Sequence, residues 1–190
     1  MPAESITNLT NYLLVATPAL DGTGFERAVI YLCSHGEDGA MGVVINNPIP
    51  EISFNEIMDS LDIIPRQAIH NDPIVFAGGP VESNRGFVLH SPDYQHESTM
   101  PLSNKASLSA TADIVTAIAT GEGPKQMNFC LGYAGWDAGQ LEQEIAENDW
   151  LVLPAEEDII YTLAAEKRHS TCVKRMGLDI SKLMHNSGSA

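Results

Sequence analysis

Residues 28–46 read AVIYLCSHGEDGAMGVVIN. Within this stretch, two apolar runs rich in β-branched residues, 28–33 and 42–45, flank the tetrapeptide Gly36-Glu37-Asp38-Gly39. An Asp-Gly pair between two such runs is a strong hairpin signal, because glycine accepts the positive φ that tight turns require. Both runs are almost continuously apolar, which is typical of strands covered on both faces. The stretch therefore predicts one buried β-hairpin.

Further strands and helices are predicted on both sides of this hairpin. Ser53 and Glu56 have the spacing of a capping box, and Asp137 and Gln140 repeat that spacing, so a helix is expected to begin at each site. Gly121 is expected to end another helix. Strands are predicted at 12–16, 74–76, 87–89, 127–131 and 150–153, and helices also at 112–120 and 165–176. Residues 84–86 are expected to separate two strands. Because strands and helices do not alternate regularly, the order favours an α+β fold with mixed strand pairing.

Length and composition are those of one folded domain. The chain has 190 residues, of which 44% are hydrophobic and 18% charged. A chain of this length usually has one core, and this composition buries enough apolar surface to offset the entropy lost on folding. No linker or repeat interrupts it, so residues 1–190 are predicted to form a single domain.

Charge and cysteine content restrict the partners and the compartment. The net charge of −15 predicts repulsion from a phosphate backbone and from anionic membrane surfaces, so direct nucleic-acid or membrane binding is not expected. Three cysteines without a Cys-x-x-Cys pair indicate reduced thiols. No apolar run reaches the roughly 20 residues of a membrane helix, and the N-terminus lacks the pattern of a secretory signal. The predicted location is the cytoplasm.

Cys33 and His35 lie two positions apart on a predicted strand, so their side chains share one face. A neighbouring protonated histidine lowers the pKa of a thiol, which makes Cys33 a candidate nucleophile with His35 or His90 as its partner. The other interpretation is a buried core cysteine, since cysteine is among the most buried residue types. The sequence identifies no third, orienting residue.

A candidate anion site involves Gly78, Gly79 and an arginine. Gly78-Gly79-Pro80 follows a predicted strand and can bring backbone amides close to an anion. It lacks the Lys-Ser/Thr of a phosphate-binding loop, however, and the sequence favours a simple turn at the strand end. Arg27 or Arg85 can complete such a site, because the planar guanidinium binds carboxylates and phosphates in a bidentate manner. The alternative for Arg85 is an ion pair with one of the chain's own acids.

Histidine spacing gives no sign of a metal site. The six histidines contain neither His-x-His nor His-x-x-x-His, and no cofactor motif is present, so neither a metal nor a cofactor is predicted. His169 lies on the apolar stripe of the last predicted helix and is expected to be a hydrogen-bonded core residue. The acidic stretch 137–166 fits either a solvated helix surface or a binding surface for a basic protein or a divalent cation.

Three sequence blocks, 21–48, 76–91 and 132–151, resemble the AlgH/YqgE family in their content and order. The resemblance covers nearly the whole chain. It implies an α+β fold in which a branched β-sheet includes a small closed barrel and is surrounded by helices. Two positions depart from the family pattern. His169 stands where the family's last helix usually has tryptophan, and the usual terminal Gly-His-Ala is Gly188-Ser189-Ala190 here.

The resemblance implies no enzymatic activity or cofactor, and some family members carry a transcriptional-regulator label. We therefore expect a non-enzymatic regulatory or binding protein that acts through an unknown protein or small molecule, rather than by direct contact with DNA. The alternative is a thiol-dependent or hydrolytic enzyme that uses Cys33. The candidate ligand-binding residues are Arg27, Gly78, Gly79, Arg85, Trp136 and Gln140.

Overall fold

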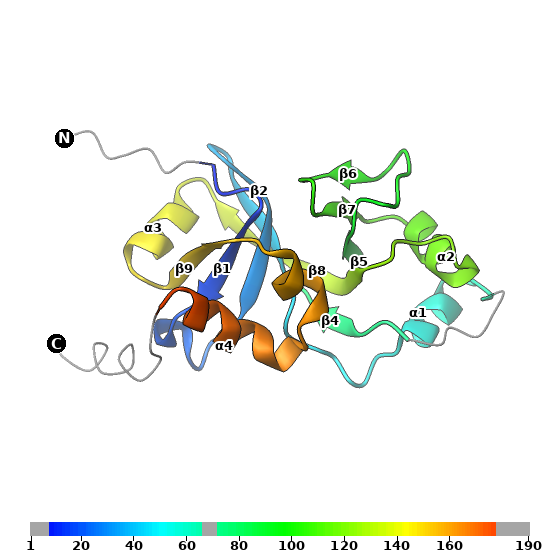
Figure 1. Cartoon of the computed structure of the whole chain (residues 1–190), viewed down its shortest axis with the longest axis horizontal. Coiled ribbons are helices and arrows are strands. Elements are labelled where there is room, and N and C mark those ends of the chain that lie inside the picture. Colours follow the sequence, from blue (N-terminus) through cyan, green and yellow to red (C-terminus); the bar gives the residue numbers. More distant parts are fainter. Residues whose placement is uncertain (1–7, 66–71, 178–190) are drawn as a thin grey trace. The chain divides into compact units, whose positions relative to one another are not determined.

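The computed structural model describes residues 8–65 and 72–177. Its contacts divide the chain into two compact units. The first unit comprises residues 1–42 and 135–190, and the second unit comprises residues 43–134. Strands β3 (Gly39–Val44) and β8 (Met127–Asp137) each begin in one unit and end in the other, so both boundaries lie within strands. Figure 1 shows the course of the chain through its strands and helices. The single domain expected from the sequence stays a prediction.

The sheet of the first unit has the strand order β8-β3-β2-β1-β9. Strand β1 (Tyr12–Ala16) pairs antiparallel with β2 (Val29–Gly36) and with β9 (Trp150–Pro154). Leu13, Leu14 and Val15 of β1 are fully buried, as the apolar run predicts. The predicted hairpin is confirmed, because β2 and β3 are neighbours and Glu37 and Asp38 lie between them.

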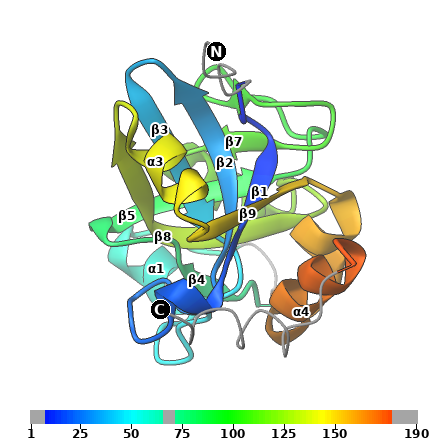
Figure 2. The same ribbon diagram turned by 90° about the vertical axis from the view of Figure 1, so that its left-hand side faces the viewer.

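Helical segments complete the described part of the first unit. They are the 3₁₀ turn η1 (Pro18–Leu20), α3 (Gln140–Ala146), the single π-turn η2 (Asp158–Thr162) and α4 (Ala165–Arg175). Figure 2 shows α3 and α4 among them. Helix α4 buries Ala165, His169, Cys172 and Val173, as predicted. Met176, the fifth residue of the predicted stripe, is the C-cap of the helix and is only half-buried. Arg168 is also buried, and its Nε donates to the Leu163 carbonyl at 3.0 Å.

The predicted start of α3 is wrong. Strand β8 continues through Asp137, and the N-cap of α3 is Gly139, without a capping side chain. The Gln140 side chain accepts a hydrogen bond from the Asp137 backbone N–H at 3.0 Å, which is one of the two contacts of the predicted capping box. The strand persists because β8 pairs with β3, and Trp136 is buried, with 7% of its surface exposed. Tertiary pairing therefore overrides the local helix-start signal.

The second unit has the strand order β6-β7-β5-β8, and β4 (Val75–Ala77) pairs with β8 in parallel. The other strands are β5 (Val81–His90), β6 (Met100–Pro101) and β7 (Ser107–Ser109). Residues 84–86, expected to separate two strands, lie inside β5. The register of β5 against β8 shifts between Val81 and Gly86, so an irregular segment of the strand carries the turn-like sequence.

In the described part of the second unit, helices α1 (Phe54–Ser60) and α2 (Ala112–Thr120) pack on the sheet. Helix α1 has the predicted capping box between Ser53 and Glu56, and α2 has the predicted bounds. Gly121 ends α2 with φ +80°, as predicted. Phe54 of α1 meets Phe129 of β8 edge to face, with the ring centroids 5.5 Å apart. Phe54 and Phe129 belong to the hydrophobic core of this unit. Its other buried members are Met58, Val75, Val88, Ile114, Val115 and Ala119.

The predicted α+β class is confirmed. The sheet branches at β8, which neighbours β5, β3 and β4. Across residues 8–65 and 72–177, the strand pairs form an open path that ends at β6 and β9. The closed barrel implied by the family resemblance is therefore not confirmed. In the same described ranges, no helix is long and apolar enough to cross a membrane.

Candidate functional site

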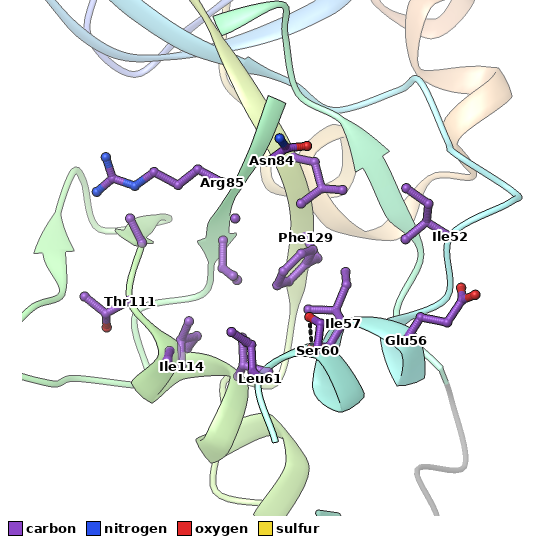
Figure 3. Close-up of a pocket in the computed structure, with 16 residues that line it drawn as sticks. Ile52, Glu56, Ile57, Ser60, Leu61, Asn84, Arg85, Thr111, Ile114 and Phe129 are labelled. Atoms are coloured by element: carbon purple, nitrogen blue, oxygen red, sulfur yellow. Dashed lines mark hydrogen bonds between the residues drawn. The ribbon is translucent and has the colours of Figure 1, made fainter. Parts of the chain in front are cut away.

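The second unit contains a cavity of about 450 Å³ (Figure 3). Its walls come from α1, β5, the segment from Ala110 into α2, and β8. Apolar side chains dominate the lining, and polar groups are few. The apolar lining residues are Ile52, Ile57, Leu61, Val88, Ile114, Val115, Phe129 and Leu131, together with Ala110 and Ala112. The polar lining residues are Glu56, Ser60, Asn84, Arg85 and Thr111.

Strand alternation explains the sheet wall of this pocket. Side chains two positions apart on a strand share one face, so Gly86 and Val88 lie on the same side of β5. Their partners on β8 are Leu131 and Phe129, which line the pocket as well. A Cβ atom at Gly86 would lie 3.0 Å from the tip of the Phe129 ring. The glycine thus leaves room for the aromatic ring beside the cavity.

Two ionisable side chains line the pocket within the described residues, Glu56 and Arg85. Hydrogen bonds from the backbone and side chain of Ser53 lower the pKa of Glu56, so its carboxylate is charged at neutral pH. Arg85 lies with its guanidinium 5.2 Å from the centroid of the Phe87 ring. In Figure 3, Arg85 extends away from Phe129 toward the edge of the lining residues. The pocket therefore combines an apolar interior with a cation at its rim.

Cys33 does not have the surroundings of a thiolate nucleophile. It lies in the first unit with 4% of its surface exposed, and burial raises the pKa of its thiol to about 12. Its Sγ donates to the Tyr31 carbonyl at 3.7 Å. His35 accepts the Leu9 N–H on Nδ1, so its Nε2 carries the proton that it donates to Glu142 at 2.8 Å. Both ring nitrogens of His35 are thus engaged away from Cys33.

His90 lies in the second unit and is completely buried. Its Nδ1 is 2.8 Å from the Ser91 carbonyl, and its Nε2 is 2.8 Å from the Ser109 hydroxyl. Because a carbonyl can only accept, Nδ1 carries the proton and Nε2 accepts from Ser109. A Ser-His contact is also found in nucleophilic enzymes. Here Ser109 is 2% exposed and also contacts the Thr99 hydroxyl at 3.0 Å, so the pair links β5, β7 and Thr99 inside the core.

The packing of Gly78 and Gly79 explains why these positions are glycines. The Gly78 N–H donates to the Leu131 carbonyl at 2.7 Å, and its carbonyl accepts from Val44 at 2.9 Å. A Cβ atom at Gly78 would lie 2.8 Å from the Cβ of Cys130. Gly79 has φ +153° and packs against the backbone of Tyr133, which leaves no space for a side chain. The Gly78 amide therefore binds β8 and not an anion.

The two arginines proposed for the anion site belong to different units. Arg27 is exposed in the first unit and has a positive φ of 54°, whereas Arg85 belongs to the second unit. Arg85 donates to Glu82 at 3.5 Å, the intramolecular ion pair that was one of the two expectations. It also lines the pocket, so the two expected roles for this residue are compatible.

Trp136 and Gln140 meet at Glu144 in the first unit. One oxygen of the Glu144 carboxylate accepts the indole N–H groups of Trp136 at 2.8 Å and of Trp150 at 2.9 Å. The other oxygen accepts from the Gln140 side chain at 3.0 Å. Phe25 packs edge to face on Trp150, with the centroids 5.7 Å apart. This cluster joins β8, α3 and β9, so Trp136 and Gln140 stabilise the first unit.

The sequence reasoning missed Glu144 and the apolar pocket walls. The four-residue spacing of Gln140 and Glu144 on one helix face is a signal for their contact. The pocket left no comparable local signal. In residues 8–65 and 72–177, no three His, Cys, Asp or Glu side chains form a group that could hold a metal ion. His70, His185 and the terminal Gly188-Ser189-Ala190 lie outside these described residues.

Known proteins resemble this chain in sequence and fold. The AlgH-like family model matches residues 13–181. A UPF0301 protein of Rhodospirillum rubrum is 44% identical over 182 residues, covering 96% of this chain and 94% of the relative. A UPF0301 protein of Thioalkalivibrio sulfidiphilus is 44% identical over 184 residues, covering 97% and 98%.

Two solved structures share the fold. The solution structure of the AlgH protein from Pseudomonas aeruginosa has a TM-score of 0.78 and 39% identity, and the match covers 100% of both chains. A crystal structure of a Corynebacterium diphtheriae protein has a TM-score of 0.70 at 21% identity, covering 95% of this chain and 94% of the other, and supports the fold alone. The family resemblance is confirmed, and the chain belongs to the AlgH-like family.

Proposed function

We propose that this AlgH-like chain is a non-enzymatic binding protein and that the pocket of the second unit is its ligand site. The observation that carries the proposal is the cavity of about 450 Å³ with mainly apolar walls. Pockets that hold small molecules have volumes of roughly 300–1,000 Å³ and combine apolar walls with a few placed polar groups. An apolar portion of a small molecule, or of a protein side chain, fits this description.

The chemistry of the candidate catalytic residues supports binding over catalysis. The thiolate is the reactive form of cysteine, and burial holds the pKa of Cys33 at about 12. Cys33, His35, His90 and Ser109 are all buried, and none of them lines the pocket. A substrate held in this cavity would therefore not contact the residues that could attack it.

We also propose that the protein is cytoplasmic, that it forms one functional domain and that any regulatory role is indirect. The three free cysteines support a cytoplasmic protein. The net charge of −15 supports action through a ligand or a protein partner rather than through nucleic acid. Any influence on transcription then passes through that partner rather than through contact with DNA. We treat residues 1–190 as one functional domain, because β3 and β8 are shared by both units.

The test is the binding of Nile red, an uncharged dye that fluoresces in apolar surroundings. We expect the native protein to bind it, and Leu61→Glu to weaken binding about tenfold or more, because a charge at the pocket wall is costly to bury. Leu61 is 44% exposed and lines the pocket. Ile64→Glu is the matched control, since Ile64 is 86% exposed and lies outside the lining.

Circular dichroism of both variants shows whether they remain folded. A native protein that does not bind the dye contradicts the proposal. So does an equal loss of binding in Leu61→Glu and Ile64→Glu, because the dye would then bind the exposed apolar surface rather than the cavity.

A further inference from the structure

The charges on the pocket walls are distributed unevenly. Glu56 and Arg85 lie on opposite sides of Phe129 in the pocket (Figure 3). The Glu56 carboxylate accepts the Ser53 N–H at 2.7 Å and contacts the Ser53 hydroxyl at 3.1 Å. These hydrogen bonds hold the Glu56 carboxylate at the start of α1. Arg85 makes only a long hydrogen bond to Glu82, at 3.5 Å, among the described residues, so its guanidinium presents a positive charge at the rim of the pocket.

The hydrogen bonding of Arg85 leaves most of its donors available to a ligand. A guanidinium has five N–H donors in a fixed planar arrangement. Among the described residues, Arg85 makes one side-chain hydrogen bond, from Nη1 to Glu82 at 3.5 Å, the limit of such a contact. The side chains of Arg85 and Glu82 are 53% and 49% exposed. An exposed pair of this kind is weak and easily replaced by another carboxylate.

The backbone of β5 places Arg85 at the rim. The pairing of β5 with β8 is interrupted between Val81 and Gly86, and Glu82 in this interval has a positive φ of 47°. Bulged segments redirect the side chains of a strand and are frequent beside functional sites. The Phe87 ring, 5.2 Å from the guanidinium, supports the cation from one side. Because Phe87 alternates with Gly86 and Val88 along β5, this contact keeps the guanidinium outside the apolar interior of the pocket.

We infer that the pocket selects amphipathic carboxylates, which are molecules with an apolar chain and a carboxylate head group. This inference rests on the proposed function, because it requires that the pocket bind a ligand. The apolar chain lies against Phe129, Ile57 and Ile114. The carboxylate lies at the rim and accepts hydrogen bonds from the Arg85 guanidinium, for which bidentate carboxylate binding is the favoured geometry.

The experiment compares three ligands with the same ten-carbon chain: decanoate, 1-decanol and decyltrimethylammonium. Each is titrated into the full chain below its aggregation concentration and followed by ¹H–¹⁵N and methyl NMR. We expect decanoate to bind about three- to tenfold more tightly than 1-decanol, in the range of an exposed charge-assisted contact. The cationic ligand is expected to bind most weakly. Shifts are expected at Ile57, Ile114 and Phe129.

Three variants assign the preference to Arg85. Arg85→Gln is expected to remove the preference for decanoate over 1-decanol. Glu82→Gln removes the competing carboxylate and is expected to strengthen decanoate binding. Lys105→Gln is the matched control, because it removes the same charge from an exposed position of the same unit outside the pocket lining.

The outcomes separate this inference from the proposed function. If none of the three ligands binds, both the pocket function and the selectivity are wrong. If decanoate and 1-decanol bind equally well, the selectivity is wrong while the binding function stands. An equal effect of Arg85→Gln and Lys105→Gln also overturns the inference, because the preference would then follow net charge and not the contact with Arg85.

Discussion

Cys33 illustrates how burial determines the chemistry of a single side chain. On the sequence it stands two positions from His35, and the two share a strand face as expected. His35, however, binds Leu9 and Glu142 with its two ring nitrogens. Without a cationic partner, the loss of hydration dominates, and the pKa of Cys33 rises to about 12. In a solvent-exposed site, hydration would favour the reactive thiolate form of the cysteine in such a pair.

Alkylation by iodoacetamide tests this description of Cys33. At pH 7.5 we expect Cys33 in the native protein to react at least about a hundredfold more slowly than in the unfolded chain, because the thiolate is the reactive species. Cys130 and Cys172 are buried too and serve as internal comparisons. Mass spectrometry of digested samples measures each site. Rapid, selective labelling of Cys33 in the native protein would restore the thiol-enzyme alternative.

One ring nitrogen of His169 is buried and accepts no hydrogen bond from the residues that the structure describes. Its Nε2 is 2.8 Å from the Ala16 carbonyl, so Nε2 carries the proton and Nδ1 is an acceptor. Among the described residues, no donor reaches Nδ1. Burial is the largest influence on the pKa of His169 and lowers it from 6.5. The folded protein therefore favours the neutral ring, which leaves a polar atom unsatisfied inside the first unit.

The lowered pKa of His169 predicts a pH dependence of stability. As pH falls below about 6.5, the unfolded chain takes up a proton that the folded chain resists, so the folded state loses stability. His169→Trp, which introduces the residue that the family resemblance implies at this position, removes this titration. We expect the loss of unfolding free energy between pH 7.5 and pH 5.5 to be smaller in the variant than in the native protein. Urea denaturation at both pH values measures it, and identical losses would contradict the assignment.

At the scale of elements, one carboxylate joins α3 to two strands. Glu144 accepts hydrogen bonds from Trp136 of β8 and Trp150 of β9, and from Gln140 one turn earlier in α3. Both tryptophans are buried, with 7% and 3% of their surfaces exposed. Removing the acceptor would leave two indole N–H groups without a partner in the core. The short helix is thus attached to the sheet through its fifth residue.

Glu144→Ala is expected to lower the unfolding free energy by about 2–4 kcal/mol, since buried donors that lose a charged acceptor are costly. Urea denaturation followed by tryptophan fluorescence measures it, and the emission should also change because both indoles lose their partner. Glu147→Ala is the control. It removes the same charge from an exposed position of the same helix turn, where Glu147 accepts from Gln143, and a change within about 0.5 kcal/mol is expected. If Glu144→Ala lowers the unfolding free energy no more than Glu147→Ala does, the three hydrogen bonds of Glu144 contribute little to stability.

Local signals in the sequence predict local structure, and the pocket shows their limit. The hairpin of β2 and β3, the capping box at Ser53 and the bounds of α2 each depend on neighbouring residues, and each is confirmed. The end of β8 was missed, because its pairing with β3 overrides a helix-start pattern. The pocket walls come from four segments whose contact depends on strand register, so no single segment indicates them. Arg85 was predicted as a ligand residue from its charge and its planar guanidinium, and its place in the pocket lining was not predicted.

At the scale of the whole molecule, net charge determines which partners approach. With a net charge of −15, the chain is expected to bind a duplex DNA oligonucleotide more weakly than about 100 µM at physiological salt, since phosphate contacts dominate such affinities. Fluorescence anisotropy with labelled DNA measures this. Tight binding that weakens steeply with added salt would indicate a basic surface that the composition does not reveal, and it would contradict indirect regulation.

The division of the chain between the two units determines the order in which the units can fold during synthesis. The second unit is continuous, from residue 43 to residue 134, whereas the first unit combines residues 1–42 with residues 135–190. Strand β1 pairs with β9 from Tyr12 to Ala16, opposite Pro154 to Trp150. Because domains form in order of synthesis, the second unit can fold while β1 still lacks one neighbour. A nascent chain that stalls before Trp150 would carry an unpaired apolar strand edge, the kind of surface that chaperones shield from aggregation.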